Sequence, residues 1–349
     1  MKISFIIPVY NGEQYLETCL ESLAAQSFMD MEVIMINDGS TDKSSDICHR
    51  YEAKDKRFRT YDQRNKGAAA ARNDGIVYAK GEWVCFVDSD DIIEKDFFIN
   101  NIVWDNTDAD IIFFGYSRLK NGIKTHVAMP KFQGTLESSV SSFFCKFILN
   151  PDIQYDEDKL PRAHVITAPW AKMYRKSFLD KYKLRFKTDL TVGEDNYFNF
   201  TVYNHHPNCY VCKKYMYIYR ENTSSLTKKY NDNIIEVMIK YYDALENYIQ
   251  NKGAVDEYSL FLPARAVRNF MYCCALDFCH KDNPKPFLQR RREFMILRNN
   301  VKYSIAFQKI RLSSLRCTVR IGAWLCKYKL FGLYCFSWWL TEYFHVSHA

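Results

Sequence analysis

The sequence predicts an α/β fold in which helices flank a Rossmann-like, mainly parallel sheet, with a helical module at the C-terminus. Two observations support this prediction. In the first 120 residues, short apolar runs that suit buried strands alternate with segments of helical periodicity, and the connections are short. From Ile234 onward, helical periodicity dominates, with breaks at Gly253, Pro263 and residues 284–286. Such alternation predicts parallel strands joined by right-handed crossovers.

The first strand is expected over residues 3–9, an apolar run that ends in the turn-forming pair Asn11-Gly12. A helix follows, because apolar residues recur on one face at helical spacing. They are Tyr15, Leu16, Cys19, Leu20 and Leu23. This first strand–helix pair sets the pattern for the units that follow.

The second and third units repeat that order. Residues 33–36 form an apolar strand, and a polar stretch follows in which Ser40 or Thr41 is suited to cap the next helix. Residues 58–61 form the third strand, and the helix after it carries Arg72.

The fourth strand is the most informative element. Residues 83–87 form a buried run that ends abruptly in Asp88-Ser89-Asp90-Asp91. Like charges crowded at the end of a buried strand are costly, and a hard divalent cation with oxygen ligands would neutralise them. The alternative is a solvated acidic turn in which Asp90 or Asp91 caps the next helix.

Three of these strand ends bring polar residues to one edge of the sheet. Tyr10 follows the first strand, Asp38 follows the second, and the acidic group follows the fourth. In open α/β sheets, ligands bind at the carboxyl ends of the strands. The sequence therefore predicts a nucleotide site at this edge.

The middle of the chain is less regular. Residues 110–116 read as another buried strand, and Asn121-Gly122 is typical of a hairpin turn. Residues 154–161 are acidic and irregular, which suits a flexible loop near an acceptor site. We expect a helix over residues 170–182 and a tyrosine-rich strand over residues 209–219.

Length and composition limit the class of protein. At 349 residues, a catalytic domain with an added module is the natural expectation, and 48% hydrophobic content supports a substantial core. We expect no membrane span and no signal peptide. Twelve cysteines without a disulfide framework predict reduced thiols in a cytoplasmic protein. The sequence lacks the dinucleotide fingerprint and the P-loop, which argues against dehydrogenases and kinases.

The C-terminal region is strongly basic. Residues 285–329 hold twelve Lys or Arg against one acid, a net charge of +11, and an aromatic run over residues 330–340 follows. This pattern predicts an amphipathic element at an anionic membrane surface, and hence a peripheral protein on the cytoplasmic face. The alternative is a basic helical module whose aromatic residues pack on the catalytic domain. No nucleic-acid-binding module accompanies the charge, so we expect no nucleic-acid partner.

Several ordered motifs resemble those of one enzyme family. They are Pro8-Val9-Tyr10-Asn11, Asn37-Asp38-Gly39-Ser40-Thr41-Asp42, Gly67, Ala71-Arg72-Asn73, Asp88-Ser89-Asp90-Asp91, Trp170-Ala171-Lys172-Met173-Tyr174, Gly193-Glu194-Asp195-Asn196-Tyr197-Phe198, Tyr219-Arg220 and Ser224-Ser225. This set resembles the signature of family 2 glycosyltransferases of the bacterial surface-glycan type, which have the GT-A fold. The resemblance implies a catalytic domain over residues 1–228, with a nucleotide-binding half at about 1–120 and an acceptor half at about 121–228. The module over residues 229–349 shows no motif of the family.

The resemblance also implies a donor site. A nucleotide-diphosphate sugar, with a UDP-sugar expected, would lie across the strand ends. Tyr10 and Asp38 match positions that contact the nucleotide base, and Pro8 shapes the strand end beside them. Arg72 matches a basic residue near the diphosphate or base. The implied nucleotide-sugar site also includes Gly67, Asp88, Ser89, Arg220 and Ser225, the last two in a segment that closes over the diphosphate or acceptor.

By the same resemblance, Asp90 matches the usual direct ligand of Mg²⁺ or Mn²⁺. Asp88 matches the first carboxylate of the D-x-D motif, which faces the ribose or a metal-bound water. Asp195 matches the catalytic base of inverting members, with Glu194 as its neighbour. Asp91 would be a second ligand or a helix cap, and the cap is preferred.

The chemistry of glycosyl transfer suits these residue types. A metal ion stabilises the leaving diphosphate as a Lewis acid, and Arg72 and Arg220 can add charge-assisted hydrogen bonds. A carboxylate such as Asp195 takes the proton of the attacking hydroxyl, and a single displacement inverts the anomeric centre. The sequence thus predicts a metal-dependent inverting glycosyltransferase acting on a glycan or lipid-linked acceptor in cell-surface polysaccharide synthesis. The alternatives are a sugar-nucleotide-forming nucleotidyltransferase, disfavoured because a Gly-rich basic loop is missing after the first strand, and a non-catalytic protein of the same fold.

Overall fold

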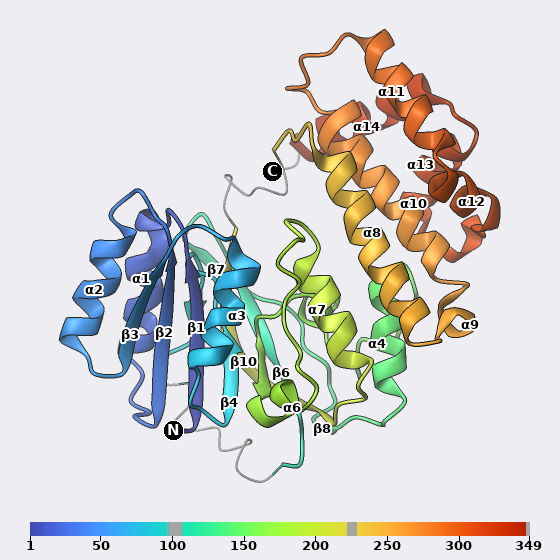
Figure 1. The fold of residues 1–349 in the computed structure, drawn as a ribbon. Coiled ribbons are helices and arrows are strands. Elements are labelled where there is room, and N and C mark those ends of the chain that lie inside the picture. The colour runs from blue at the N-terminus through green and yellow to red at the C-terminus, as the bar shows by residue number, and fades with distance from the viewer. Residues whose placement is uncertain (96, 98–106, 222–228, 347–349) are drawn as a thin grey trace. The chain divides into compact units, whose positions relative to one another are not determined.

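The structure is a computed structural model that describes residues 1–95, 97, 107–221 and 229–346 (Figure 1). The chain divides into two compact units. The first combines Met1–Cys145 with Tyr155–Asn222, and the second combines Lys146–Gln154 with Thr223–Ala349. The segment Lys146–Gln154 thus belongs with the C-terminal helices, although it lies inside the predicted catalytic domain. Nothing in the sequence pattern indicated that this segment belongs to the second unit.

One mixed sheet forms the centre of the first unit. Its strands lie in the order β3-β2-β1-β4-β9-β6-β10-β5, with β7 paired to β6 and β8 paired to β10. The described strands are β1 (Ile3–Val9), β2 (Met31–Asp38), β3 (Phe58–Gln63), β4 (Trp83–Phe86), β5 (Ile92–Ile93), β6 (Ile111–Lys120), β7 (Ile123–His126), β8 (Gly134–Thr135), β9 (Lys172–Arg175) and β10 (Cys209–Arg220). The predicted α/β class with parallel central strands is confirmed.

The strands β3, β2, β1 and β4 form the parallel half, coloured blue to cyan in Figure 1. The helices α1 (Glu13–Ala24), α2 (Ser44–Lys54) and α3 (Ala68–Tyr78) connect them. β1 and β2 are buried along almost their whole length, as expected for parallel strands covered on both faces. Helix α3 packs closely on β1, because a Cβ atom at Gly75 would lie 2.2 Å from Ile6 Cγ2.

The region after β4 corrects one prediction. The helix expected over residues 170–182 is instead strand β9 followed by the short helix α6 (Lys176–Lys181). Ala171 has a φ of 53°, a left-handed conformation that cannot continue a helix. Tyr174 then stands between Val84 of β4 and Ile111 of β6, so that the backbone of β9 is paired on both sides. Pairing across the sheet therefore overrides the local helical pattern.

The other strand predictions in this region are confirmed. β6 and β7 form the expected hairpin, with Asn121 and Gly122 at φ values of 50° and 79°. β10 covers the tyrosine-rich segment and pairs in parallel with β6. The remaining helices of this unit include α5 (Ala163–Thr167) and α7 (Glu194–Tyr203), while α4 (Val140–Leu149) runs from the first unit into the second.

The second unit is helical, as predicted for the C-terminal part. Its described helices are α8 (Ile234–Asn251), α9 (Val255–Tyr258), α10 (Leu262–Cys273) with a π-helical turn at Cys274–Phe278, α11 (Phe287–Asn299), α12 (Val301–Lys309), a 3₁₀ turn at Leu312–Ser314, α13 (Cys317–Lys327) and α14 (Phe331–Val346). Phe270 of α10 is fully buried and makes edge-on ring contacts with Phe294, Tyr303 and Phe307. Within the described ranges, no helix is both long and apolar enough to cross a membrane.

Candidate active site

The turns that follow β1 and β2 are tied to each other at the carboxyl edge of the sheet. Asn11 has a φ of 48°, its N–H donates to Ser40 Oγ (3.1 Å), and its Oδ1 accepts from Thr41 N (2.8 Å). The predicted helix cap is therefore wrong, because Ser40 and Thr41 are engaged with Asn11. Asp42 Oδ1 instead accepts from Ser44 N (2.9 Å) at the start of α2.

Tyr10 and Asp38 end the neighbouring strands β1 and β2 and differ sharply in exposure. The Tyr10 side chain is 52% exposed, which leaves its ring free to meet a ligand. Asp38 is only 3% exposed, and its carboxylate accepts hydrogen bonds from Gln63 Nε2 (2.7 Å), Lys66 N (2.8 Å) and Gly67 N (2.8 Å). Asp38 thus organises the loop between β3 and α3, where Gly67 has a φ of 87° that favours glycine.

Arg72 joins carboxylates from two distant parts of the sequence. This buried arginine of α3 donates from Nη2 to Asp88 Oδ1 (2.9 Å) and from Nη1 to Asp195 Oδ1 (2.9 Å). Glu194 Oε1 lies 3.5 Å from the same Nη1. Sequence reasoning assigned Arg72 to the diphosphate or base, but both terminal nitrogens are paired with acids of this protein.

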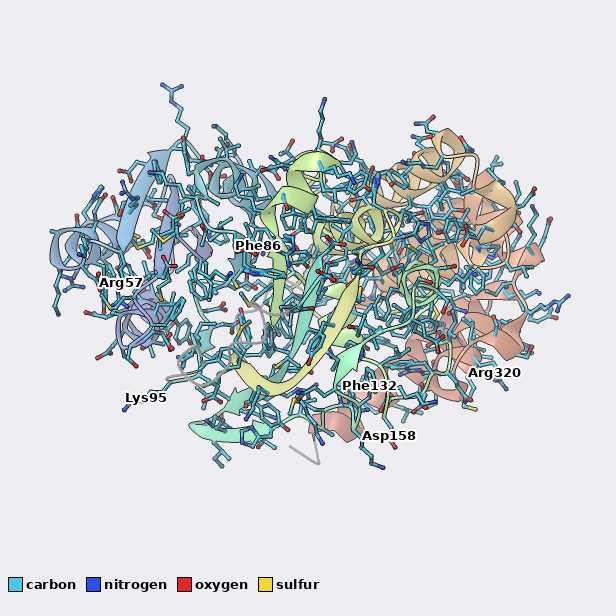
Figure 2. The ribbon with its side chains drawn as sticks, turned by 90° about the horizontal axis from the view of Figure 1, so that it is seen from below. Arg57, Phe86, Lys95, Phe132, Asp158 and Arg320 are labelled. Carbon is cyan, nitrogen blue, oxygen red and sulfur yellow. The ribbon has the colours of Figure 1, made fainter. Side chains whose placement is uncertain are left out.

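The residue after Arg72 supports its position. Asn73 Nδ2 donates to Phe186 O (2.8 Å), and Asn73 Oδ1 accepts from Phe186 N (2.7 Å). This reciprocal pair fixes Phe186, whose ring centroid lies 5.3 Å from the Arg72 guanidinium carbon. Phe86, which is labelled in Figure 2, is buried, and its ring contacts those of Tyr174, Phe186 and Phe198. A rigid aromatic core therefore carries the charged cluster.

The pKa values in this cluster are strongly shifted. Burial lowers the pKa of Arg72, but Asp195, Asp88 and Glu194 outweigh it and the net shift is upward. Burial, with help from Asp195, raises the pKa of Glu194 to about 7 against the pull of Arg72. Burial likewise raises the pKa of Asp195, which Arg72 opposes and Asp88 reinforces. The guanidinium stays charged, while the acids resist ionisation.

Asp91 is a buried anchor and not a helix cap. Its Oδ2 accepts from Tyr217 OH (2.5 Å) and its Oδ1 from Arg220 N (2.8 Å). The predicted helix cap is wrong, because strand β5 and not a helix follows Asp91. The carboxylate instead accepts hydrogen bonds from two residues of β10. Burial, Asp88 and Asp90 raise the pKa of Asp91 well above its usual range.

Arg220, the last residue of β10, lies at the same acidic loop. Its Nε donates to Asp90 O (2.9 Å), and its guanidinium carbon lies 4.9 Å from the centroid of the Tyr15 ring. Ser225, predicted in the same segment of the nucleotide-sugar site, lies outside the described residues.

Ser89 and Pro8 complete the predicted set. A Cβ atom at Gly12 would lie 3.2 Å from Ser89 Oγ, so the acidic loop meets the turn after β1. Pro8 is opposite Ile36 in the β1–β2 register, close to the ends of both strands. Every described site residue that the sequence singled out therefore belongs to this edge of the sheet or to α7.

The chemistry of these groups suits a divalent cation. Five carboxylates, from Asp88, Asp90, Asp91, Glu194 and Asp195, outnumber two guanidinium groups, from Arg72 and Arg220. No three His, Cys, Asp or Glu side chains of the described chain could hold a metal ion by themselves. Two aspartates suffice where substrate phosphates and water supply the other oxygen ligands. Asp88, whose side chain is 30% exposed, fits that role together with Asp90.

Sequence reasoning missed the residues that support the site from behind. Tyr217 fixes Asp91, the buried Lys172 lies behind α7, and the buried Asn199 belongs to that helix. One signal was available, since a lysine inside the apolar sequence Trp170-Ala171-Lys172-Met173-Tyr174 is unusual and needs buried acceptors.

Comparisons with known proteins identify the class to which this fold and site belong. The model of Glycosyl transferase family 2 matches residues 4–183, more than half of the chain. The chain belongs to this family and is a glycosyltransferase. The putative glycosyltransferase EpsH of Bacillus subtilis (strain 168) is 29% identical over 282 residues, which cover 78% of this chain and 76% of EpsH. The poly(ribitol-phosphate) beta-glucosyltransferase of Bacillus spizizenii is 30% identical over 263 residues, which cover 73% of this chain and 37% of that protein.

A solved structure supports the same fold. The crystal structure of S. aureus TarS 1-349 in complex with UDP has a TM-score of 0.62 to this chain at 21% identity. The match covers 97% of this chain and 90% of the TarS chain. The predicted GT-A fold is confirmed.

Proposed function

We propose that this protein transfers a sugar from a UDP-sugar to a hydroxyl group of its acceptor, with inversion at the anomeric carbon. The observation that carries this proposal is the pairing of Asp88 and Asp195 through Arg72 at the carboxyl edge of the sheet. Asp88, on the donor side, and Asp195, the candidate base, are thereby bound to the same guanidinium group. The complex of TarS with UDP supports the choice of nucleotide.

Asp195 is the proposed catalytic base. Arg72 binds its Oδ1, the side chain is 30% exposed, and within the described residues Oδ2 has no hydrogen-bond partner. Oδ2 can therefore accept the proton of the acceptor hydroxyl while the arginine fixes the direction of the carboxylate. A positioned base of this kind contributes roughly 10²–10⁴-fold to a rate.

Asp90 and Asp88 are the proposed ligands of Mg²⁺ or Mn²⁺. Bound there, the ion would offset the negative charge that develops on the leaving diphosphate. Arg220 is beside the same loop and can add a charge-assisted hydrogen bond to that group. Asp91 stays with Tyr217 and β10, since both of its oxygens are already engaged by the protein.

The test is a transfer assay with a panel of nucleotide sugars, with Mn²⁺ or with chelator. We expect Asp195→Asn and Asp90→Ala to lose at least about 10²-fold in turnover. Asp180→Asn, which breaks a surface ion pair with Lys176, is the matched control and should keep its activity. Full turnover in both site variants would refute the mechanism. Pyrophosphate release from a nucleoside triphosphate would point to a nucleotidyltransferase instead.

The proposed acceptor is a glycan or lipid-linked precursor of a cell-surface polysaccharide. The poly(ribitol-phosphate) beta-glucosyltransferase relative supports this, since its name gives a polymer, poly(ribitol-phosphate), as its acceptor. The loop at residues 154–161, proposed for acceptor contact, includes the exposed ion pair of Asp158 with Lys131. Product analysis with lipid-linked and soluble acceptors would separate the two.

The second unit supports a role at an anionic membrane on the cytoplasmic face. Large apolar side chains are exposed on α13 and α14, namely Ile321, Trp324, Tyr328, Leu333, Phe336 and Trp339. The basic stretch at residues 285–329 precedes α14, and exposed aromatic residues with nearby cations suit a lipid interface. We expect co-sedimentation with phosphatidylserine vesicles to weaken in Trp324→Ala/Phe336→Ala. It should persist in the control Leu260→Ala, a more exposed apolar site on the same unit. Equal binding by both variants would contradict the membrane role.

A further inference from the structure

Lys172 is a buried lysine directly behind the helix that carries Asp195. It begins β9 and is 0% exposed. Its Nζ donates to Ala168 O (2.7 Å), Asn199 Oδ1 (3.0 Å) and Tyr203 OH (3.0 Å). Ile166 O lies slightly farther away, at 3.1 Å. These partners are uncharged oxygens from α5, α7 and the segment between α5 and β9.

The hydrogen-bond pattern fits an ammonium group. Tyr203 OH donates its own proton to Ile166 O (2.8 Å), so it accepts from Lys172. Ala168 O, Asn199 Oδ1 and Tyr203 OH thus need three N–H donors, which an ammonium has and a neutral amine lacks. Burial lowers the pKa of Lys172 well below its usual range. The rings of Phe113, Tyr174 and Tyr203, with centroids 5.4 to 5.8 Å from Nζ, work against that loss of charge.

Asn199 connects this lysine to Asp195. Its Oδ1 accepts from Lys172 and from Tyr174 OH (2.8 Å), while its Nδ2 donates to Thr167 O (2.8 Å) and Asp195 O (3.1 Å). Because Lys172 Nζ and Tyr174 OH both donate, the end of the Asn199 amide that faces them must be its oxygen. The amide nitrogen must then face the carbonyl of Asp195, one turn earlier in α7.

The first turn of α7 carries Glu194 and Asp195. Gly193 is its N-cap residue, with a φ of 83°, and no side chain caps the helix. First turns without caps leave backbone donors unsatisfied and fray readily. The hydrogen bond from Asn199 to Asp195 O and the contacts of Arg72 with Glu194 and Asp195 add support to this turn, beside the backbone bond from Tyr197 N to Gly193 O (2.9 Å).

We propose that Lys172 is a positioning residue, which fixes the Asp195 carboxylate for catalysis by orienting the amide of Asn199. The inference rests on the proposed role of Asp195 as base, and it adds Lys172 and Asn199 as the residues that keep Asp195 in position. Lys172 touches neither donor nor acceptor, so its loss should affect kcat and leave donor binding in place.

The test compares Lys172→Met, Asn199→Leu and the double variant in the transfer assay, using the full chain. We expect each single variant to lose roughly 10–100-fold in kcat, the cost of misplacing a catalytic group by about an ångström. Binding of UDP, measured by calorimetry, should stay within a few-fold of wild type. The double variant should lose no more than the worse single variant, because both changes remove the same connection.

Two further variants keep the test decisive. Asn199→Asp preserves an acceptor for Lys172 and Tyr174 but cannot donate to Asp195 O, so kcat should fall even if Lys172→Met fails to fold. Tyr203→Phe removes a different partner of Lys172 and should reduce stability while kcat stays within about 2-fold.

Three results would overturn the inference. They are additive losses in the double variant, a fall in UDP affinity that matches the fall in turnover, and wild-type kcat in Asn199→Asp. Asp195→Asn, run in parallel, separates this from the proposed function. If that variant is inactive and Lys172→Met is fully active, only the role of Lys172 fails, whereas full activity in Asp195→Asn refutes both.

Discussion

Replacing Glu194 with glutamine should stabilise this protein at neutral and higher pH. The folded protein raises the pKa of this carboxyl group from 4.5 to about 7, because it is buried and stands beside Asp195. Between these two pH values, the folded state keeps a proton that the unfolded state has lost. Stability therefore falls as pH rises from about 4.5 to about 7, and the full cost applies above that range.

The size of the effect follows from the shift. A change of this size in pKa corresponds to about 3 kcal/mol near pH 8, and to less than about 1 kcal/mol near pH 5. Glutamine keeps the shape and an oxygen for Arg72 but has no charge to bury. We expect the Tm of Glu194→Gln to exceed that of wild type by roughly 5–10 °C near pH 8, with near equality at pH 5.

Thermal unfolding followed by circular dichroism across that pH range measures this directly. The comparison between variants cancels the titration of the carboxyl groups that lie away from Glu194. Parallel Tm curves for wild type and Glu194→Gln would refute the reasoning, as would a variant that is less stable than wild type at pH 8. The control Glu137→Gln changes an exposed carboxyl group and should follow wild type at every pH.

Three other substitutions test the contacts around the site. Arg72→Met should lower the free energy of unfolding by about 3–5 kcal/mol, because it leaves Asp88 and Asp195 close together without a cation. An unchanged midpoint of chemical denaturation would contradict this. Asp38→Asn should weaken nucleotide binding several-fold and lower the free energy of unfolding by about 1–3 kcal/mol, since an amide nitrogen cannot accept a hydrogen bond from Lys66 N or Gly67 N. Nucleotide affinity equal to that of wild type, measured by calorimetry, would argue against this role. Tyr217→Phe should cost about 1–3 kcal/mol, because Asp91 loses a buried donor, and a melting temperature equal to that of wild type would exclude this account.

The parallel half of the sheet could be predicted because several local signals agreed there. Apolar runs, helical periodicity and Asn-Gly turns all favoured the same alternation, and β1 to β4 and α1 to α3 follow it. The edge that collects Tyr10, Asp38 and Asp88 followed from topology alone, since parallel strands end on one side. Because local and long-range preferences agree in this half of the sheet, its strands and helices could be predicted from the sequence.

The errors occurred where distant contacts decide the outcome. The sequence around β9 has a helical pattern, but the strand is fixed by pairing with β4 and β6, which no local pattern reveals. Asp91 suits a helix cap by residue type, yet it serves β10 from more than a hundred positions away. Arg72 is ambiguous for the same reason, because its acidic partner Asp195 is brought in by α7.

The position of Arg72 bears on the chemistry of the whole site. Both of its terminal nitrogens bind acids of the protein, so it has little capacity left for a diphosphate. Asp88 and Asp90 bring two carboxylates to this edge, and a nucleotide diphosphate brings further negative charge. Like charges at this separation repel strongly where water is excluded. Arg220 alone cannot offset that repulsion, and this is a reason of its own for the divalent cation that we propose at Asp88 and Asp90.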